Sequence, residues 1–169
     1  DKVYRAVHLA HHADPEGEGD PHSPYQKGRW KVLFGNLVYY RKAAKDKALV
    51  AKYSRDFKEG RLDKILVHTW IFPTLGTAAL CWLMGIGWAL LAITLHSGGY
   101  IFLSGAINSL GHDRTLGYAN YPNTARNIRF LALLTGGEGL HNNHHGAASD
   151  PKFSQRPDEF DPAWPVIRF

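Results

Sequence analysis

Residues 65–109 read ILVHTWIFPTLGTAALCWLMGIGWALLAITLHSGGYIFLSGAINS, and this run contains no Lys, Arg, Asp or Glu. One helical crossing of a bilayer needs about 20 apolar residues, so the run is long enough for two crossings. Gly85-Ile86-Gly87 interrupts it and predicts a turn, which places the crossings near 65–83 and 87–109. The alternative is a buried hairpin in a soluble protein, but a chain of 169 residues is too short to cover so much uncharged surface.

The segment that precedes this run is basic. Residues 27–64 hold 12 of the 20 Lys and Arg residues, against 4 acidic residues. Apolar residues recur in it with helical spacing (Trp30, Leu33, Phe34, Leu37, Val38), which indicates an amphipathic region at a membrane surface; an ordinary solvated helix pair is the alternative. By the positive-inside rule this segment is cytoplasmic, and a two-crossing hairpin returns the chain to the same side.

We therefore expect an all-α integral membrane protein, in a bacterial inner membrane or the endoplasmic reticulum. It would be a single partial domain: a cytoplasmic region over 1–64, a transmembrane helical hairpin over 65–109 and a second cytoplasmic region over 110–169. The two cytoplasmic regions would form a helical cap on the hairpin.

The chain has ten His residues, and six of them form two HxxHH patterns. On a helix, positions i, i+3 and i+4 fall at about 0°, 300° and 40°, so each pattern places three imidazoles on one face. The hairpin returns both patterns to one side of the membrane, where they can surround metal. The candidate ligands are His8, His11, His12, His141, His144 and His145.

His112, at the end of the second predicted crossing, is a further candidate ligand. Asn108 lies one helical turn before it and can hold a water on the metal or hydrogen-bond a ligand. A zinc ion usually takes three or four protein ligands, so this many imidazoles favour two metal ions. A redox-active pair beside a membrane suggests iron and oxygen chemistry.

Three motifs together resemble those of the membrane fatty acid desaturases. They are His8–His12 followed by Asp20-Pro21-His22, then Asn108–His112, then Gly137–His145. The most similar subgroup is the acyl-CoA or acyl-lipid Δ9-type enzymes. The resemblance implies two iron ions, O2 as co-substrate and a double bond introduced into a fatty acyl chain. It also implies that the seven His named above are ligands and that Asn108 reaches iron through water.

The same family has a first box, HxxxH or HxxxxH, which supplies two more ligands, and no pattern in this chain replaces it. We therefore expect a fragment that lacks this box. The family's second box is matched by His8–His12. The chain departs from the family shortly after it, where Asp14-Pro15 replaces an aromatic residue and Ser, with Glu16 and Glu18 following.

Metal-bound imidazoles usually donate their other N–H to a carboxylate, a carbonyl or water. Five residues near the boxes are candidates for this supporting role, with Asp20 and Glu138 favoured: Asp20, Glu138, Asn142, Asn143 and Asp150. We interpret His22 as a loop or supporting residue, and His68 and His96 as structural.

The substrate would be a CoA-linked or lipid-linked acyl chain. Arg41-Lys42 stand where acyl-CoA members of the family meet the CoA phosphates, although basic residues here also serve membrane anchoring. With one Cys and no haem motif, the chain needs an external cytochrome b5-like or ferredoxin-like electron donor, which the basic face at 27–64 can dock. We expect contact with membrane lipid and no nucleic-acid partner.

Two other interpretations stay open. A related membrane di-iron hydroxylase, ketolase or alkane monooxygenase would insert oxygen instead of removing hydrogen. A non-catalytic metal-binding membrane protein, or a remnant that lost its first box, would hold metal without consuming oxygen.

Overall fold

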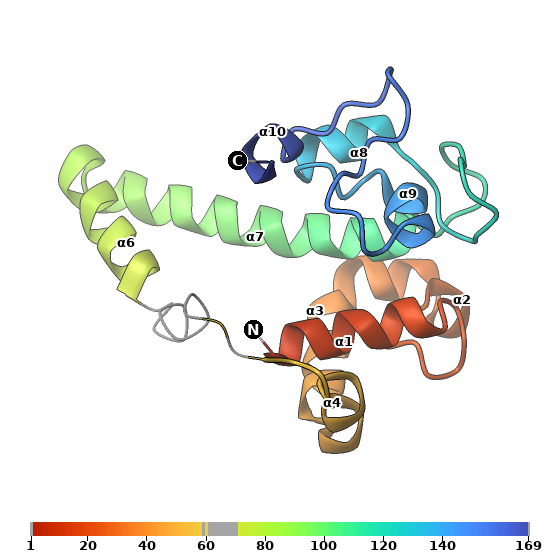
Figure 1. Ribbon diagram of the computed structural model, residues 1–169. Coiled ribbons are helices and arrows are strands. Elements are labelled where there is room, and N and C mark those ends of the chain that lie inside the picture. Colours follow the sequence, from red (N-terminus) through yellow and green to blue (C-terminus); the bar gives the residue numbers. More distant parts are fainter. Residues whose placement is uncertain (1, 59, 61–70, 169) are drawn as a thin grey trace.

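The computed structural model describes residues 2–58, 60 and 71–168, and this part of the chain is mostly helical, as expected, with no strands. Two isolated antiparallel bridges join Tyr118 to Asn127 and Asn127 to Leu140. The helices in chain order are α1 (Lys2–Ala13), α2 (Pro24–Lys27), α3 (Arg29–Lys45), α4 (Lys47–Tyr53), α6 (Ile71–Met84), α7 (Ile86–Leu110), α8 (Arg129–Leu134), α9 (His141–Gly146) and α10 (Trp164–Ile167) (Figure 1).

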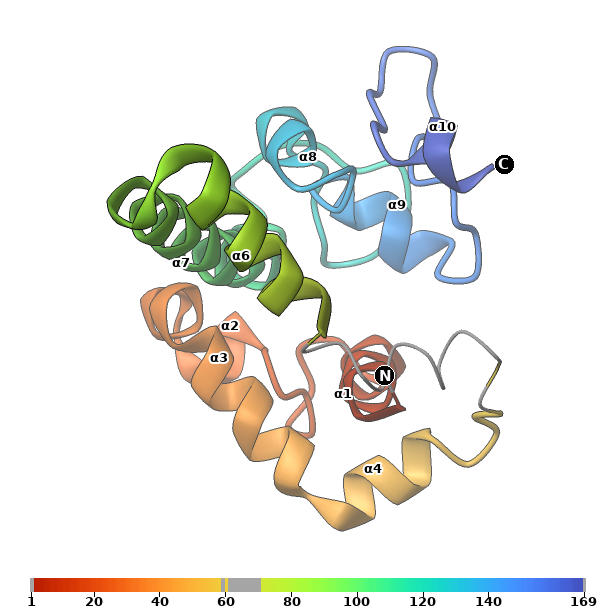
Figure 2. The ribbon, with the colours of Figure 1, turned by 90° about the vertical axis from the view of Figure 1, so that its left-hand side faces the viewer.

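Helix α7 is the central element of the fold. Its C-terminal half lies between helices α1 to α4 on one side and α8, α9 and α10 on the other (Figures 1 and 2). Leu33 of α3, Ala106 of α7 and Leu131 of α8 form a buried apolar cluster at this place. The end of α7 therefore holds together segments that are far apart in the sequence.

Helices α3 and α7 approach each other closely at Gly105. A Cβ atom there would lie 2.1 Å from the backbone oxygen of Leu33, so the crossing needs a residue without a side chain. Nearby, the Ser109 hydroxyl donates to the backbone oxygen of Arg29 at 2.8 Å. The Arg29 guanidinium also pairs with Asp113, just beyond α7.

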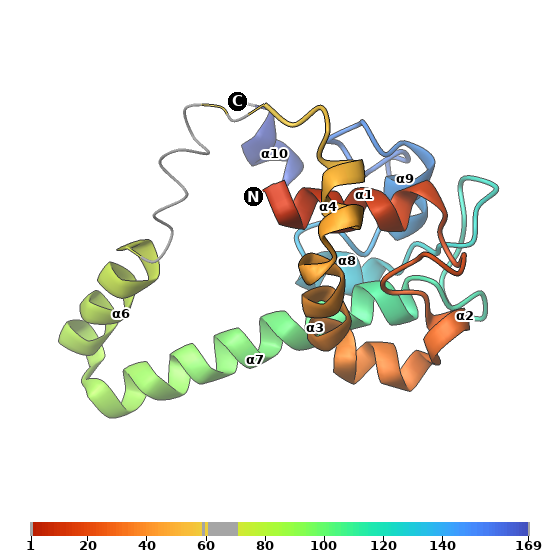
Figure 3. The same cartoon turned by 90° about the horizontal axis from the view of Figure 1, so that it is seen from below.

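The uncharged run forms two helices that meet at Gly85. Helix α6 ends at Met84, Gly85 adopts a left-handed φ of 81°, and α7 starts at Ile86, so the predicted break is observed (Figure 3). Among the described residues, only α7 is both long and apolar enough to cross a membrane, and α6 has 14 residues. Residues 65–70 of the first predicted crossing lie outside the described residues, and so does His68.

The apolar side chains of α3 face two different surroundings. Leu33 is 6% exposed and packs against α7, whereas Trp30, Phe34 and Val38 are 61%, 72% and 67% exposed. The Phe34 ring lies 6.1 Å from the ring of Phe102 on α7, between centroids. The exposed apolar face of α3 is therefore continuous with the exposed apolar surface of α7.

Candidate metal centre

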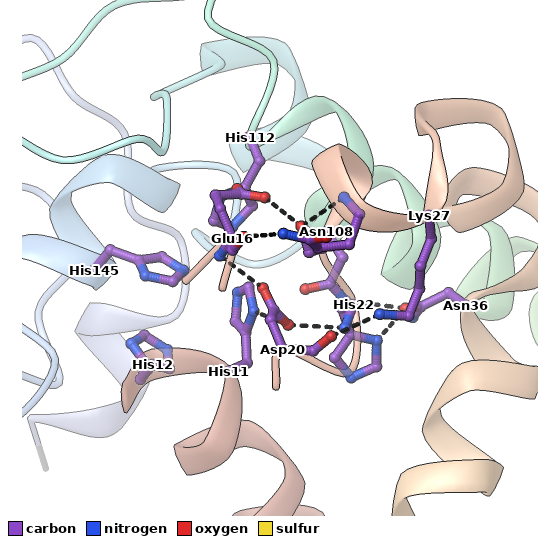
Figure 4. A network of polar contacts seen from close by, with 12 residues as sticks. His11, His12, Glu16, Asp20, His22, Lys27, Asn36, Asn108, His112 and His145 are labelled. Carbon is purple, nitrogen blue, oxygen red and sulfur yellow. Dashed lines mark hydrogen bonds and ion pairs between the residues drawn. The ribbon is translucent and has the colours of Figure 1, made fainter. Parts of the chain in front are cut away.

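Three separate segments supply the seven candidate imidazoles. His8, His11 and His12 project from α1, and His112 follows the C-cap residue of α7. The second HxxHH pattern forms α9, which begins at His141. Both patterns are helical, as their spacing predicted. Figure 4 shows imidazoles from all three segments turned toward one region.

The imidazoles converge in two groups. In each group every residue offers one ligand atom, and those atoms lie within 4.8 Å of one another. We call them the four-histidine group (His11, His112, His141, His145) and the three-histidine group (His8, His12, His144).

Within each group the Nε2 atoms point at one another. In the four-histidine group, His141 Nε2 lies 3.0 Å from His112 Nε2 and 3.2 Å from His145 Nε2. In the three-histidine group, His144 Nε2 lies 2.9 Å from His12 Nε2 and 3.1 Å from His8 Nε2.

These distances suit metal ligands. Two nitrogens that are each about 2.1 Å from one ion and about 90° apart are about 3.0 Å from each other. A neutral imidazole carries only one N–H, so three converging Nε2 atoms cannot all satisfy one another by hydrogen bonding. His11 Nε2 is also buried and has no hydrogen-bond partner within residues 2–58, 60 and 71–168. The two groups therefore fit two metal ions.

The electrostatics favour the neutral form that binds metal. Burial, together with neighbouring imidazoles, lowers the pKa of His8 to about 4, of His144 to about 3 and of His12 to about 2. The same causes lower the pKa values of His141 and His145. At neutral pH these rings are uncharged, and no protons need to leave before a cation binds.

Two carboxylates lie beside the outward Nδ1 atoms of His11 and His112, two members of the four-histidine group. Asp20 Oδ1 accepts a hydrogen bond from His11 Nδ1 at 2.9 Å, and Asp20 is itself fixed by the amides of His22 and Glu16. Glu16 Oε1 lies 2.6 Å from His112 Nδ1. Figure 4 shows both carboxylates beside their imidazoles. The motifs in the sequence indicated Asp20 but not Glu16, although an acidic residue directly after His8–His12 was a usable signal.

Asn108 belongs to a polar network on the same side of α7. Its amide nitrogen donates to the Ser104 carbonyl at 3.2 Å and to Asn36 Oδ1 at 3.3 Å. Asn36 Oδ1 also accepts from His22 Nδ1 at 2.6 Å, and its amide nitrogen donates to Ser104 Oγ at 3.0 Å. With both amide hydrogens of Asn108 engaged, its oxygen remains to accept a hydrogen bond. No local pattern in α3 identifies Asn36.

Asn142 and Asn143, which lie inside the second HxxHH pattern, bond to the loops around α9. Asn142 accepts from the amides of Asn120 and Tyr121, and donates to the backbone oxygen of Ala125. Asn143 donates to Glu159 Oε2 at 2.8 Å, and its oxygen accepts from the side chains of Asn120 and Asn127. The hydrogen bonds of both side-chain amides therefore fix the position of α9 against these loops.

Among the remaining candidates, Glu138 lines a cavity together with His8 and His141, whereas the others lie at the surface. Glu138 is mostly buried, and burial together with the Asp161 carboxylate raises its pKa. Asp150 is exposed and accepts from the Lys152 amide at 2.9 Å. Arg41 and Lys42 are exposed on α3.

Two cavities reach His8. One, of about 200 Å³, lies between α1, α3 and α7, and its wall includes His8, His11, Asn108 and several apolar or aromatic side chains. The other, of about 360 Å³, is lined by His8, His141 and Glu138. Tyr4 and Tyr100 line both cavities.

The sequence is similar to that of known proteins. A family described as "Fatty acid desaturase" matches residues 2–151. The chain is 29% identical to "Delta-9 acyl-lipid desaturase 2" of Arabidopsis thaliana over 97% of its own length and 53% of that protein. It is 30% identical to "Delta-9 desaturase-like 2 protein" of the same plant (97% and 54%) and 26% identical to "sn-1 stearoyl-lipid 9-desaturase" of Synechocystis (96% and 50%).

The chain thus spans about half the length of these relatives. No solved structure matches it significantly.

Proposed function

The chain belongs to the fatty acid desaturase family, and from this we propose that its protein introduces a double bond into a fatty acyl chain at a histidine-ligated pair of iron ions. The convergence of seven imidazoles from three segments into two groups is the observation that carries this proposal. The four-histidine group would hold one ion and the three-histidine group the other. The names of the relatives favour the Δ9 position for the double bond.

Bound iron would supply the activation of O2 and the removal of two hydrogens from neighbouring carbons. The reaction balances when O2 takes up these two hydrogens, two electrons from a donor and two protons, and leaves as two waters. The donor would be a cytochrome b5-like or ferredoxin-like protein, and the basic residues of α3 and α4 favour an acidic partner.

Apolar and aromatic side chains beside the imidazoles suit an uncharged hydrocarbon chain as the reacting part of the substrate. The smaller cavity has an apolar wall that includes Leu37, Tyr40, Tyr100 and Ile101. His8 and His11 line the same cavity. An acyl chain lying there would exclude water from the two groups. Arg41 and Lys42, exposed on α3, would meet the phosphates of a head group.

Asn108 would act on the four-histidine group through water. Its free amide oxygen can accept a hydrogen bond from a water that also contacts the ion, while Ser104 and Asn36 hold the amide nitrogen away. Asp20, which accepts from His11 Nδ1, would keep the His11 Nε2 lone pair available for the ion.

We place α7 across the membrane, with α6 and the residues before it forming the other arm of the hairpin. The exposed apolar surfaces support this arrangement, since Trp82 is 85% exposed and Leu95 is 66% exposed. The exposed apolar face of α3 would lie in the membrane interface on the cytoplasmic side, and the histidine-bearing segments would form a cap there.

The test is product analysis. The protein is expressed in a host that lacks its own desaturase, and fatty acids are profiled for a new double bond. The wild type and His96→Gln, at an exposed position on α7, should produce it, whereas His145→Ala should not. A hydroxylated fatty acid as the main product would favour the monooxygenase alternative, and no product from any variant would contradict the proposal.

A further inference from the structure

Glu16 has a backbone conformation that its residue type disfavours. Its φ is 70°, and it is the one residue other than Gly with a positive φ among the described residues. This left-handed conformation is strained for a residue with a side chain, whereas Gly adopts it freely. A loop that needed only to turn here would be better served by Gly, so the Glu16 side chain itself must have a use.

That side chain reaches the four-histidine group. Glu16 Oε1 lies 2.6 Å from Nδ1 of His112, whose side chain is fully buried. The other carboxylate oxygen, Oε2, accepts a hydrogen bond from Ser23 Oγ at 2.7 Å. The carboxylate is thus held on one side by Ser23 and presented on the other to His112.

The loop that carries Glu16 is also fixed. The Glu16 amide donates to Asp20 Oδ2 at 3.0 Å, and its carbonyl accepts from the Gln26 side chain at 3.0 Å. Asp20 holds His11, whose ring centroid lies 4.9 Å from that of His112. One short loop therefore places a carboxylate beside each of two neighbouring imidazoles: Asp20 accepts a hydrogen bond from His11, and Glu16 lies within ion-pair distance of His112 (Figure 4).

His112 needs such a contact more than the other imidazoles do. It follows the end of α7 instead of lying within a helix that carries two more ligands. A carboxylate at Nδ1 fixes the ring orientation and keeps the proton on Nδ1, so that the Nε2 lone pair faces His141 and the centre of the group.

We infer that Glu16 is a positioning residue that holds His112 in its metal-binding orientation and thereby strengthens metal binding at the four-histidine group. This inference rests on the proposed metal centre. Its effect is confined to one group, because the contacts of Glu16 run to His112 and, through Asp20, to His11, and both belong to that group.

The test measures Co2+ affinity of the purified protein in detergent by chelator competition, in two backgrounds. His12→Ala removes a ligand of the three-histidine group and isolates the four-histidine group, while His145→Ala does the reverse. Glu16→Gly removes the side chain without backbone strain. It should weaken Co2+ binding by about 10-fold to 100-fold in the His12→Ala background and by less than about twofold in the His145→Ala background.

Two further variants sharpen the result. Glu18→Gly, at an exposed position of the same loop, should leave Co2+ affinity unchanged in both backgrounds. Glu16→Gln keeps an acceptor oxygen, so it should lose less affinity than Glu16→Gly, and it provides the comparison should the glycine variant not fold.

Unchanged affinity for both Glu16 variants, or an equal loss in both backgrounds, would overturn the inference, since a general effect on folding would weaken both groups alike. Absence of Co2+ binding in both backgrounds without any Glu16 change would instead overturn the proposed metal centre, and this inference with it.

Discussion

Replacing Gly105 by Ala tests the packing that positions the candidate metal centre. The added Cβ atom would lie 2.1 Å from the backbone oxygen of Leu33 and 3.0 Å from its carbonyl carbon. Both are backbone atoms, so no side-chain rotation relieves the contact. Because ordinary van der Waals contact begins near 3.4 Å, α3 and α7 must separate by roughly 1 Å.

The expected effect follows from three contributions. Overpacking of this kind costs about 1–3 kcal/mol. The separation also stretches the hydrogen bonds that Asn36 forms with Ser104 and Asn108, each worth about 1 kcal/mol. Ala in place of Gly recovers about 1 kcal/mol of helix propensity. The net loss is on the order of 2 kcal/mol, which lowers the unfolding temperature by about 4–8 °C for a chain of this size.

Thermal unfolding in detergent, followed by circular dichroism, measures this difference. Gly98→Ala is the matched control, because a Cβ atom at Gly98 meets nothing within 4 Å in the described part of the chain. It should unfold at or above the wild-type temperature. If Gly105→Ala and Gly98→Ala unfold at the same temperature, the close approach of α3 and α7 is not as described.

Three other predictions concern the surroundings of the imidazoles. Asn36→Leu removes the oxygen that accepts a hydrogen bond from Asn108, so it should lower product formation by about 10-fold to 100-fold while bound metal is retained. Asn36→Asp keeps an acceptor oxygen and should lose less activity. If Asn36→Leu is as active as the wild type, Asn36 does not orient Asn108. Asn143→Ala breaks buried hydrogen bonds, including one to a carboxylate, and should lower the free energy of unfolding by about 3 kcal/mol, measured by thermal unfolding against the exposed control Ser149→Ala. The metal-free protein should lose stability as pH falls from about 6.5 toward 4, because His12 and His144, with pKa values of about 2 and 3, stay neutral in the fold but bind protons when unfolded. Urea unfolding across this pH range checks the sign, and stability that rises on acidification would refute it.

Much of the local structure followed from spacing and composition. The HxxHH patterns predicted three imidazoles on one helical face, and both patterns are helical in α1 and α9. The glycines near 85 predicted the break between the two apolar helices, and α7 has the length and composition of a crossing. These features depend on residues close together in the chain, which periodicity describes well.

The contacts between distant segments could not be predicted in this way. Asn36 and Asn108 are 72 residues apart, and a pattern in one helix does not say which face of another helix it meets. Glu16 reaches His112 only because the loop after α1 folds back beside the end of α7. Periodicity also did not show that Trp30 and Phe34 stay exposed while Leu33 is buried.

The residues Asn142 and Asn143 illustrate the same limit. Their place inside the second HxxHH pattern suggested that they support the ligand imidazoles directly. Their amides instead bond to the loops at 120–127 and 153–159, so any support passes through the placement of α9. Glu159, which accepts from Asn143 16 residues away, gives no local signal in the sequence.

The most direct test of the metal centre is the iron content of the purified protein, measured by mass spectrometry of the metal after expression in iron-rich medium. The two imidazole groups predict about two iron ions per chain in the wild type and in His96→Gln. His141→Ala should lose iron from the four-histidine group, and a combined His141→Ala and His144→Ala variant should lose both ions. Wild-type protein without iron, or a double variant that keeps as much iron as the wild type, would contradict the proposed centre.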